Sequence, residues 1–435
     1  MRSQAELGTE RYVISVGTGS GSFTMRPAVD SLVGSVSGGI RRNDCGELMN
    51  GFEIFSWVLV GVWAVALFPA WYGLVRSRFL RDVPPRGGDD LPSISIIVPA
   101  RDEAAAIDEA LRRMLSLDYP DYEVIAINDR STDGTGGLMD RVAAEMGSRL
   151  QVVHIAELPT GWLGKNHALS LGAKRARGEF LLFTDGDVMF DPQILRRSMT
   201  VVEDRALDHL VLLPETLTST FFEAALINFF CIMLMAATRF PLVRWKWFKQ
   251  AYLGVGAFNL LRRTAYDTIG GFETLQLEIA DDLMLGRLVK QHGLNQDVYG
   301  GQQNLSVRWQ TGGVWSIVRG LEKNAFSGTG YSVVRTLGAV AVLLTLFVGP
   351  FVALLCGQVT LPVLILSIGS LLLSVGTAWS VGFPVAAGLF FPWAVVVFCF
   401  IMLRSMMMTL RQGGVRWRDT FYSLADLRQA RRPGQ

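Results

Sequence analysis

Apolar residues gather in two stretches of the chain that carry no charge. The first covers residues 54–75, and the second, residues 336–403, contains no Asp, Glu, Lys, Arg or His. Since a bilayer crossing takes about 20 apolar residues, the first stretch predicts a transmembrane helix at 52–75, and the second predicts two or three within 336–404. The first stretch begins too far along the chain, and is too long, for the apolar part of a signal peptide. The pattern indicates a multi-pass protein of the cell membrane.

Positive charges beside these stretches indicate an orientation. Four arginines closely follow the first stretch and two precede it: Arg76, Arg78, Arg81 and Arg86 against Arg41 and Arg42. By the positive-inside rule, the region from about 76 to 335 is expected on the cytoplasmic side. The basic tail, residues 405–435, is expected there too, which two C-terminal crossings allow and three do not. The charges do not decide whether the C-terminal part crosses the membrane twice or three times.

The chain begins with a segment rich in glycine and serine. Residues 1–50 contain runs such as "VGTGSGSF" and no hydrophobic periodicity, which predicts a disordered leader. Met49 offers an alternative start, and the sequence does not decide between the two.

Between the apolar stretches, short apolar runs alternate with amphipathic ones. The runs predict buried strands at 94–98, 123–127, 151–155 and 180–184, and helices follow at about 103–116, 136–147 and 166–177. This alternation predicts an α/β domain with a mostly parallel sheet and helices on both faces. Ligands of such sheets bind beyond the carboxyl ends of the strands.

Acidic residues follow three of these strands. "VPARDE" supplies Glu103, "NDRSTDGT" supplies Asp129, and "TDGDV" supplies Asp185 and Asp187. Carboxylates at one edge of a sheet repel one another unless a cation or hydrogen-bond donors lie between them. Both side chains of Asp-x-Asp in extended backbone point the same way, which suits a divalent cation shared with a diphosphate. Each motif alone also fits an ordinary turn, but together they favour a site.

Composition removes other classes of function. The net charge is +2 with no basic block, which argues against a nucleic-acid partner. The four cysteines lie far apart and show neither metal-ligand spacing nor a disulfide framework.

Five segments, in this order, resemble a family 2 glycosyltransferase: "SIIVPARDE", "EVIAINDRSTDGT", "GWLGKNHAL", "GEFLLFTDGDV" and "IADDLMLGRLVKQHG". The resemblance covers about residues 92–330, with Asn128 where the family usually has Asp. It implies a GT-A (Rossmann-like) domain inserted between membrane helices. The flanking spans and "VWSIVRGLEKNAFSG" resemble the membrane-bound subgroup that glycosylates lipids, such as the hopanoid-associated, carotenoid and ceramide glycosyltransferases. The implied reaction moves a sugar from a nucleotide, UDP above all, to a lipid hydroxyl with inversion.

The resemblance also implies roles for the residues that bind the donor. Asp129 would contact the nucleotide base and Glu103 the nucleoside. Lys165 would lie over the base or the diphosphate. Asp185 and Asp187 would hold Mg²⁺ or Mn²⁺ against the diphosphate.

The acceptor end of the site is implied in the same way. Asp282 would take the proton from the acceptor hydroxyl, and Asp281 stands beside it where Glu is common; helix capping is the simpler explanation for this pair. The segment "LSVRWQ" keeps Arg308 and Trp309 of a Gln/Arg-x-x-Arg-Trp motif that grips the diphosphate, but has Leu305 at the first position.

Residues 221–249 join an apolar stretch to a basic, aromatic one. The segment reads "FFEAALINFFCIMLMAATRFPLVRWKWFK", and its Trp-Lys-Trp cluster favours a helix lying at the membrane interface. The alternative is a buried core helix followed by a surface loop.

Two other functions are weighed against a lipid glycosyltransferase. A processive polysaccharide synthase would need a longer catalytic region and an intact Gln-x-x-Arg-Trp. A catalytically silent membrane protein that binds nucleotide sugars would be expected to have lost its carboxylates. All four are present: Asp129, Asp185, Asp187 and Asp282.

Overall fold

The structure is a computed structural model that divides into two compact units, residues 1–59 and 60–435. The described residues are 6–7, 10–11, 42–147, 149–308, 312–322, 325–417 and 420–430. The leader expected over 1–50 lies largely outside them, apart from two paired strands, β1 (Glu6–Leu7) and β2 (Glu10–Arg11), and the start of helix α2 (Arg42–Arg76).

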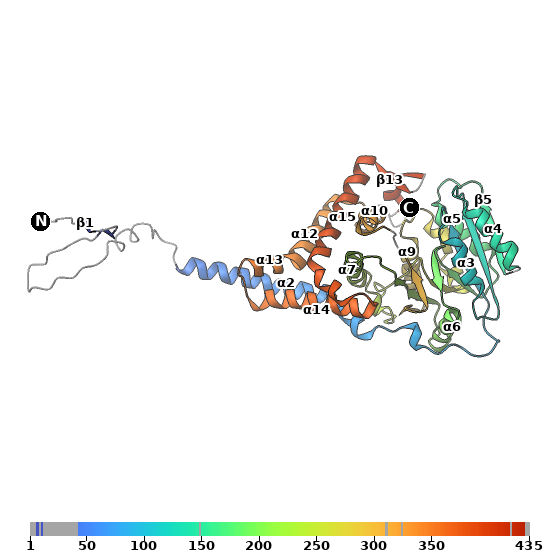
Figure 1. Cartoon of the computed structure of the whole chain (residues 1–435), viewed down its shortest axis with the longest axis horizontal. Coiled ribbons are helices and arrows are strands. Elements are labelled where there is room, and N and C mark those ends of the chain that lie inside the picture. The colour runs from blue at the N-terminus through green and yellow to red at the C-terminus, as the bar shows by residue number, and fades with distance from the viewer. Residues whose placement is uncertain are drawn as a thin grey trace, which may run out of the picture. The chain divides into compact units, whose positions relative to one another are not determined.

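A seven-stranded mixed sheet forms the centre of the α/β domain (Figure 1). Its strands run in the order β11 (Gln296–Gly300), β8 (His209–Leu213), β10 (Asn259–Arg262), β6 (Phe180–Phe183), β3 (Ile94–Ala100), β4 (Tyr122–Asp129) and β5 (Leu150–Ile155). Only β10 is antiparallel to its neighbours among these strands. The mostly parallel α/β sheet predicted from the sequence is confirmed, and the four predicted strands are β3 to β6.

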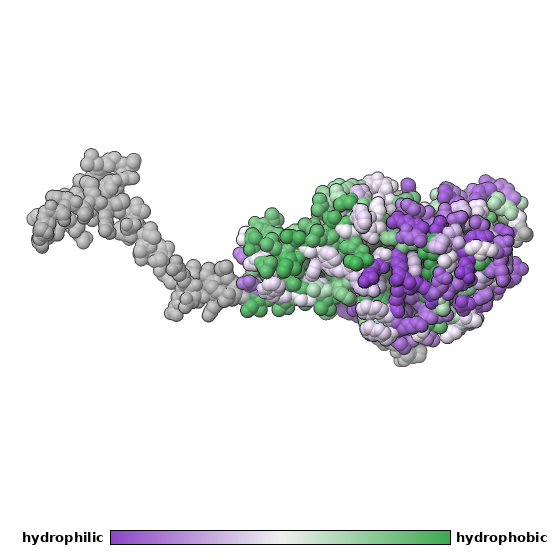
Figure 2. Space-filling model, turned by 90° about the horizontal axis from the view of Figure 1, so that it is seen from below, coloured by the Kyte–Doolittle hydropathy of each residue, from purple (hydrophilic) through white to green (hydrophobic). Residues whose placement is uncertain are grey.

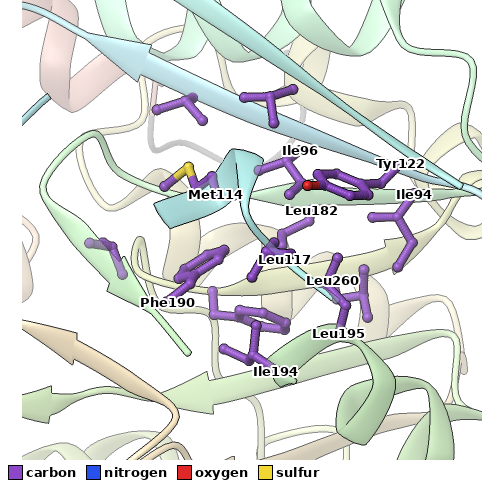
Figure 3. Close-up of a cluster of buried hydrophobic side chains, with 14 of the residues drawn as sticks. Ile94, Ile96, Met114, Leu117, Tyr122, Leu182, Phe190, Ile194, Leu195 and Leu260 are labelled. Atoms are coloured by element: carbon purple, nitrogen blue, oxygen red, sulfur yellow. The ribbon is translucent and has the colours of Figure 1, made fainter. Parts of the chain in front are cut away.

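Helices cover both faces of this sheet (Figure 1). One face packs against α3 (Ile107–Leu115), α4 (Thr135–Met146) and α6 (Ile194–Asp204), and the other against α5 (Gly164–Arg175), the 3-10 helix η3 (Gly271–Leu275) and α9 (Asp281–Gln291). Successive side chains of β3 alternate between the two cores, so that Ile96 lies in the first and Ile97 in the second. Figure 3 shows the first core, where Ile96, Leu182 and Leu260 of three strands lie near Phe190 and Ile194.

Shorter elements complete the chain between the sheet and the tail. A second sheet has three strands in the order β7 (Val188–Phe190), β12 (Leu305–Val307) and β9 (Glu215–Thr216). The remaining helices of the domain are η1 (Leu80–Asp82), α7 (Phe221–Thr238), η2 (Phe240–Leu242), α8 (Arg263–Thr268), α10 (Val314–Glu322) and α11 (Ala325–Gly328). The C-terminal part holds α12 (Val333–Leu343), the π-helix η4 (Leu344–Val348), α13 (Gly349–Leu355), α14 (Leu361–Val381), η5 (Val385–Phe390), α15 (Phe391–Gln412), β13 (Gly414–Trp417), β14 (Thr420–Ser423) and α16 (Leu424–Ala430).

Five helices of the described chain are long and apolar enough to cross a membrane: Gly51–Arg76, Phe221–Thr238, Val333–Leu355, Leu361–Val381 and Val385–Gln412. Figure 2 shows the corresponding separation of an apolar region from a hydrophilic one. Buried polar contacts join some of these helices. Trp63 Nε1 donates to Ser370 Oγ at 2.9 Å, and Asn228 Nδ2 donates to Ser374 Oγ at 3.0 Å. Hydrogen bonds between apolar helices contribute to the specific packing of one helix against another.

Helix α7 leaves the central sheet and returns to it. The helix begins with a capping box formed by Thr220 and Glu223. Strand β8 precedes α7 in the chain, and β10 and β11 follow it, yet β8 pairs with both. Both ends of α7 therefore lie on the same side of any membrane.

The C-terminal tail packs on the α/β domain. Val415 and Leu427 lie in one buried cluster with Leu163 and Ile279 of that domain. The guanidinium of Arg428 donates to the Tyr331 carbonyl at 2.7 Å.

A buried polar network holds the segment 253–256 against the sheet. Gln296 on β11 donates through Nε2 to the Leu253 carbonyl at 2.9 Å and accepts from the Leu253 amide at 3.2 Å. His209 on β8 lies between Gln296 and Asn259 at 2.6 Å and 3.1 Å, and burial lowers its pKa to about 4. The imidazole is therefore neutral at ordinary pH, and the network is one of uncharged groups.

We expect Gln296→Leu to destabilise the protein, because it leaves the Leu253 amide, the Leu253 carbonyl and His209 without this partner. Each buried polar group left unpaired costs about 1–3 kcal/mol. Thermal unfolding of the full chain in detergent measures the loss. Gln291→Leu, at an exposed position at the end of α9, is the control and should leave the midpoint unchanged. Equal midpoints for both variants would contradict a stabilising role of the network.

Candidate active site

A cavity of about 2160 Å³ adjoins the central sheet and the apolar helices. Four of the charged residues expected at the site line it: Lys165, Asp185, Asp281 and Asp282. They come from the start of α5, the end of β6 and the start of α9. The fold thus gathers residues that are far apart in the sequence at the wall of one cavity.

Lys165 is the cation around which these carboxylates lie. Its Nζ is 2.7 Å from Asp185 Oδ1 and 3.8 Å from Asp281 Oδ2. Burial lowers the pKa of Lys165, but the negative charges of Asp185, Asp281 and Asp282 outweigh burial, and its pKa is raised. A lysine in the first turn of a helix is unfavourable for the helix dipole. The neighbouring carboxylates compensate for that position.

The backbone segment 253–256 holds Asp282 in place. The Gly256 amide donates to Asp282 Oδ2 at 2.7 Å, and the Gly256 carbonyl accepts from the Asp185 amide at 2.9 Å. The N-cap residue of α9 is Ala280, which makes no side-chain cap bond, and Asp282 Oδ1 accepts from the first-turn amide of Leu283 at 2.7 Å. Burial raises the pKa of both carboxyl groups, and Lys165 opposes the rise.

Glycine is required at two positions of this segment. A Cβ on Gly256 would collide with the Asp185 carboxylate and lie 3.2 Å from Lys165 Nζ, and one on Gly254 would collide with the Asp282 carbonyl. These glycines were missed from the sequence. The alternating glycines of "LGVGAFN" immediately before a strand were the available signal.

Among the described residues Asp187 forms no ion pair, and Lys165 pairs with Asp185 and Asp281 instead. Burial, the charge of Asp185 and the charge of Glu103 together raise its pKa to about 7, and Lys165 lowers it less. Among the described residues no three His, Cys, Asp or Glu side chains form a metal cluster. Mg²⁺ is commonly held by one or two carboxylates together with substrate phosphates. Asp187 and Asp185 therefore fit a divalent cation that is shared with substrate phosphates. They do not fit a cation that is bound by protein ligands alone.

The expected nucleotide end is built on Asp129. This carboxylate is buried and accepts from Arg130 Nε at 2.8 Å, with Arg101 NH1 at 4.0 Å. A Cβ on Gly164 would collide with it, so the start of α5 lies directly against Asp129. Arg101 belongs to the polar motif expected after the first strand, whereas Arg130 was missed because it is simply a basic residue in a turn of the sequence.

Glu103 and Asn128 are anchored by their surroundings. The Glu103 amide donates to Thr135 Oγ1 at 2.8 Å, and its carboxylate is close enough to raise the pKa of Asp187. Asn128 Nδ2 contacts His154 Nδ1 at 3.0 Å, and its Oδ1 accepts from the Ser131 amide.

Arg308 is not gathered with the carboxylates in the described part of the chain. It follows β12, is exposed and does not line the cavity. Trp309, its expected companion, lies outside the described residues.

Comparison with known proteins identifies the class of the domain. Residues 95–270 match the family described as Glycosyl transferase family 2, and the chain carries a glycosyltransferase domain of that family. The fold is similar to that of a mannosyltransferase from Pyrobaculum calidifontis, solved in complex with GDP-Man and Mn²⁺, with a TM-score of 0.50 and 17% identity over 81% of this chain and 98% of that one. The expected GT-A fold is confirmed.

Three relatives carry glycosyltransferase or glycolipid synthase names. A probable glycosyltransferase, YdaM, of Bacillus subtilis is 27% identical over 45% of this chain and 47% of its own length. The 4,4'-diaponeurosporenoate glycosyltransferase of Staphylococcus haemolyticus is 24% identical over 59% of this chain and 68% of its own length. The beta-monoglucosyldiacylglycerol synthase of a Nostoc species is 28% identical over 45% of this chain and 40% of its own length. The chain thus spans about half or less of the first and third of these relatives.

We expect Asp187→Asn to stabilise the metal-free protein near pH 8. Because the folded-state pKa is raised, the folded state binds a proton more tightly, and the free energy of unfolding falls as pH rises through about 4 to 7. Removing the charge should recover about 1–3 kcal/mol. Thermal unfolding in EDTA measures this, with Asp204→Asn, an exposed acid, as the neutral control.

The same variant should lose the stabilisation that Mn²⁺ and UDP together give to the unmodified protein. A variant that is less stable in EDTA, yet still responds to Mn²⁺ with UDP, would contradict the assignment of Asp187.

Proposed function

We propose that the protein is a membrane glycosyltransferase that moves a sugar from a nucleotide donor to a lipid hydroxyl. One observation carries this proposal: the cavity lined by Lys165, Asp185 and Asp282 continues along apolar residues of α7, α12 and α15. A polar reaction centre and a place for a hydrocarbon body thus share one cavity.

The donor binds along the sheet edge. Asp129, held by Arg101 and Arg130, faces the base, and Glu103 lies toward the nucleoside. A uridine nucleotide is the donor we propose. The neighbour solved with GDP-Man supports a nucleotide sugar in general.

The diphosphate lies between Lys165 and the Asp185–Asp187 pair. Lys165 offers a positive charge, and Asp281, 3.8 Å away, orients its amino group. A bound Mg²⁺ or Mn²⁺ held by Asp187 and Asp185 supplies charge stabilisation to the leaving diphosphate. The mannosyltransferase solved with Mn²⁺ supports such an ion.

Asp282 acts as the base. Its Oδ2 is fixed by the Gly256 amide, and its raised pKa makes it a better proton acceptor than an ordinary aspartate. It takes the proton of the acceptor hydroxyl while that oxygen attacks the anomeric carbon and the bond to the diphosphate breaks. A single base facing a single leaving group fits direct displacement with inversion.

The lipid class of the acceptor is supported by the cavity and by the relatives named for 4,4'-diaponeurosporenoate and for a monoglucosyldiacylglycerol. A processive polysaccharide synthase is disfavoured, since Leu305 stands at the first position of the Gln/Arg-x-x-Arg-Trp motif. A silent binding protein is disfavoured because the carboxylates are present and held in place.

The membrane topology we propose has three crossings: α2, the helix from Val333 to Leu355, and α14. Helix α7 stays on the catalytic side because both of its ends join one sheet. The tail packs on the catalytic domain, so an even number of crossings separates it from residue 331. Helix α15, which packs against α7 and α10, is then an interfacial helix on the cytoplasmic side.

The experiment that tests the function uses purified full-length protein in nanodiscs. A panel of radiolabelled nucleotide sugars is supplied with lipids extracted from the host. Label moving into the lipid phase, with release of an equal amount of nucleoside diphosphate, supports the proposal. Donor hydrolysis without any lipid product, or product of polymer length, contradicts it.

Asp282→Asn should bind the donor normally and transfer the sugar at least about a hundredfold more slowly, since a general base contributes roughly 10²–10⁴-fold. Initial rates with the lipid acceptor and calorimetric donor affinity are compared for each variant. Asp267→Asn, at an exposed acid of α8, is the matched control. If Asp282→Asn lowers the melting temperature but leaves the initial rate of sugar transfer unchanged, Asp282 is not the base.

The topology predicts which positions a membrane-impermeant maleimide reaches in intact cells. Cys356, exposed between α13 and α14, should be labelled in a chain whose other cysteines are serine. Arg411→Cys at the end of α15, with Cys356 also replaced, should be labelled only after lysis. Labelling of position 411 in intact cells would require three C-terminal crossings.

A further inference from the structure

Seven arginines line the same cavity, and five of them precede residue 300 in the chain: Arg76, Arg78, Arg239, Arg244 and Arg287. They come from the end of α2, the turn after it, the end of α7, the turn after η2, and α9. None of them has a role in the transfer proposed above. Their gathering in one cavity needs a separate explanation.

Direct contacts bring these segments together. Gly73 of α2 packs so closely on the chain after α7 that a Cβ there would lie 2.8 Å from Pro241. Arg76 and Arg239 stand three and two residues from this contact, so both lie near the place where the two helices meet. The Tyr252 amide donates to the Thr238 carbonyl, and the ring of Tyr252 lies 5.9 Å from the Arg287 guanidinium.

The negative charge among these arginines is insufficient. Asp297, which also lines the cavity, is paired with Arg244 at 2.8 Å and with Arg205 at 3.3 Å. In the described part of the chain Arg76, Arg239 and Arg287 form no ion pair. Positive charge therefore exceeds negative charge in this part of a cavity whose other walls are largely apolar.

Two ordinary effects explain only part of this arrangement. Arg239 follows α7, where the helix dipole favours a cation, and Arg76 ends an apolar helix, where arginines gather on the cytoplasmic side. Neither effect requires the side chains to line a cavity. The φ of Arg239, 54°, is that of the left-handed residue that ends α7, and its amide donates to the Met235 carbonyl.

We infer that this arginine cluster binds the phosphate of an anionic phospholipid from the cytoplasmic leaflet. Guanidinium groups bind phosphate through paired, charge-assisted hydrogen bonds. The acyl chains of such a lipid match the apolar walls supplied by α2, α7 and α12. The inference rests on the membrane placement proposed above and is independent of the chemistry of transfer.

Lipid retention tests the inference on the full chain. The protein is placed in nanodiscs that contain both phosphatidylcholine and anionic phosphatidylglycerol, and the lipids that stay bound are identified by native mass spectrometry. The unmodified protein should keep phosphatidylglycerol in clear preference to phosphatidylcholine. The double variant Arg76→Gln, Arg239→Gln should lose that preference by about tenfold, because hydrogen bonds between charged partners are strong.

Matched variants separate a site from general surface charge. Arg81→Gln with Arg411→Gln removes the same charge near the membrane but outside the cavity, and should keep the preference. Arg76→Lys with Arg239→Lys should keep part of it. Equal preference in the Gln cavity variant and the unmodified protein, or an equal loss in the control pair, would overturn the inference. Cysteine labelling of position 356 reports separately on the membrane placement.

Discussion

The site depends on the charge balance around one lysine. Lys165 lies 2.7 Å from Asp185 and 3.8 Å from Asp281, in the first turn of α5. Without it, buried carboxylates would face one another, and their repulsion would favour protonated forms. Without the carboxylates, a cation would be unfavourable at the start of a helix. Each side of this arrangement therefore favours the charged form of the other, although burial still raises the pKa of Asp281 and Asp282.

The close approach of the chain at residues 253–256 connects the proposed donor end of the site to the proposed acceptor end. Gly256 accepts from the Asp185 amide through its carbonyl and donates to the Asp282 carboxylate through its amide. Gln296 fixes the segment from the sheet side. A rigid sheet is thus connected by hydrogen bonds to the proposed base, which suits a reaction that depends on placing a hydroxyl and an anomeric carbon together.

Much of the fold follows from hydrophobic patterning, since buried parallel strands such as 94–98 and 180–184 read as uninterrupted apolar runs. The first helix was expected from 103 but begins at Ile107, because residues 103–106 form a turn that ends in hydrogen bonds to the Glu103 carbonyl. The acidic residues of the site were predicted because their motifs directly follow predicted strands, and the carboxyl ends of parallel strands lie at one edge of the sheet. The arginine cluster and Gly256 were not, since their roles arise only when segments far apart in the sequence come into contact.

The stereochemistry of the product tests the account most directly. If Asp282 removes the hydroxyl proton while the diphosphate leaves from the opposite face, the anomeric configuration must invert in a single step. Nuclear magnetic resonance of the purified glycolipid, made from a donor of known anomeric configuration, measures it. The account predicts the opposite configuration in the product. Retention of the donor configuration would contradict single displacement and the role of Asp282.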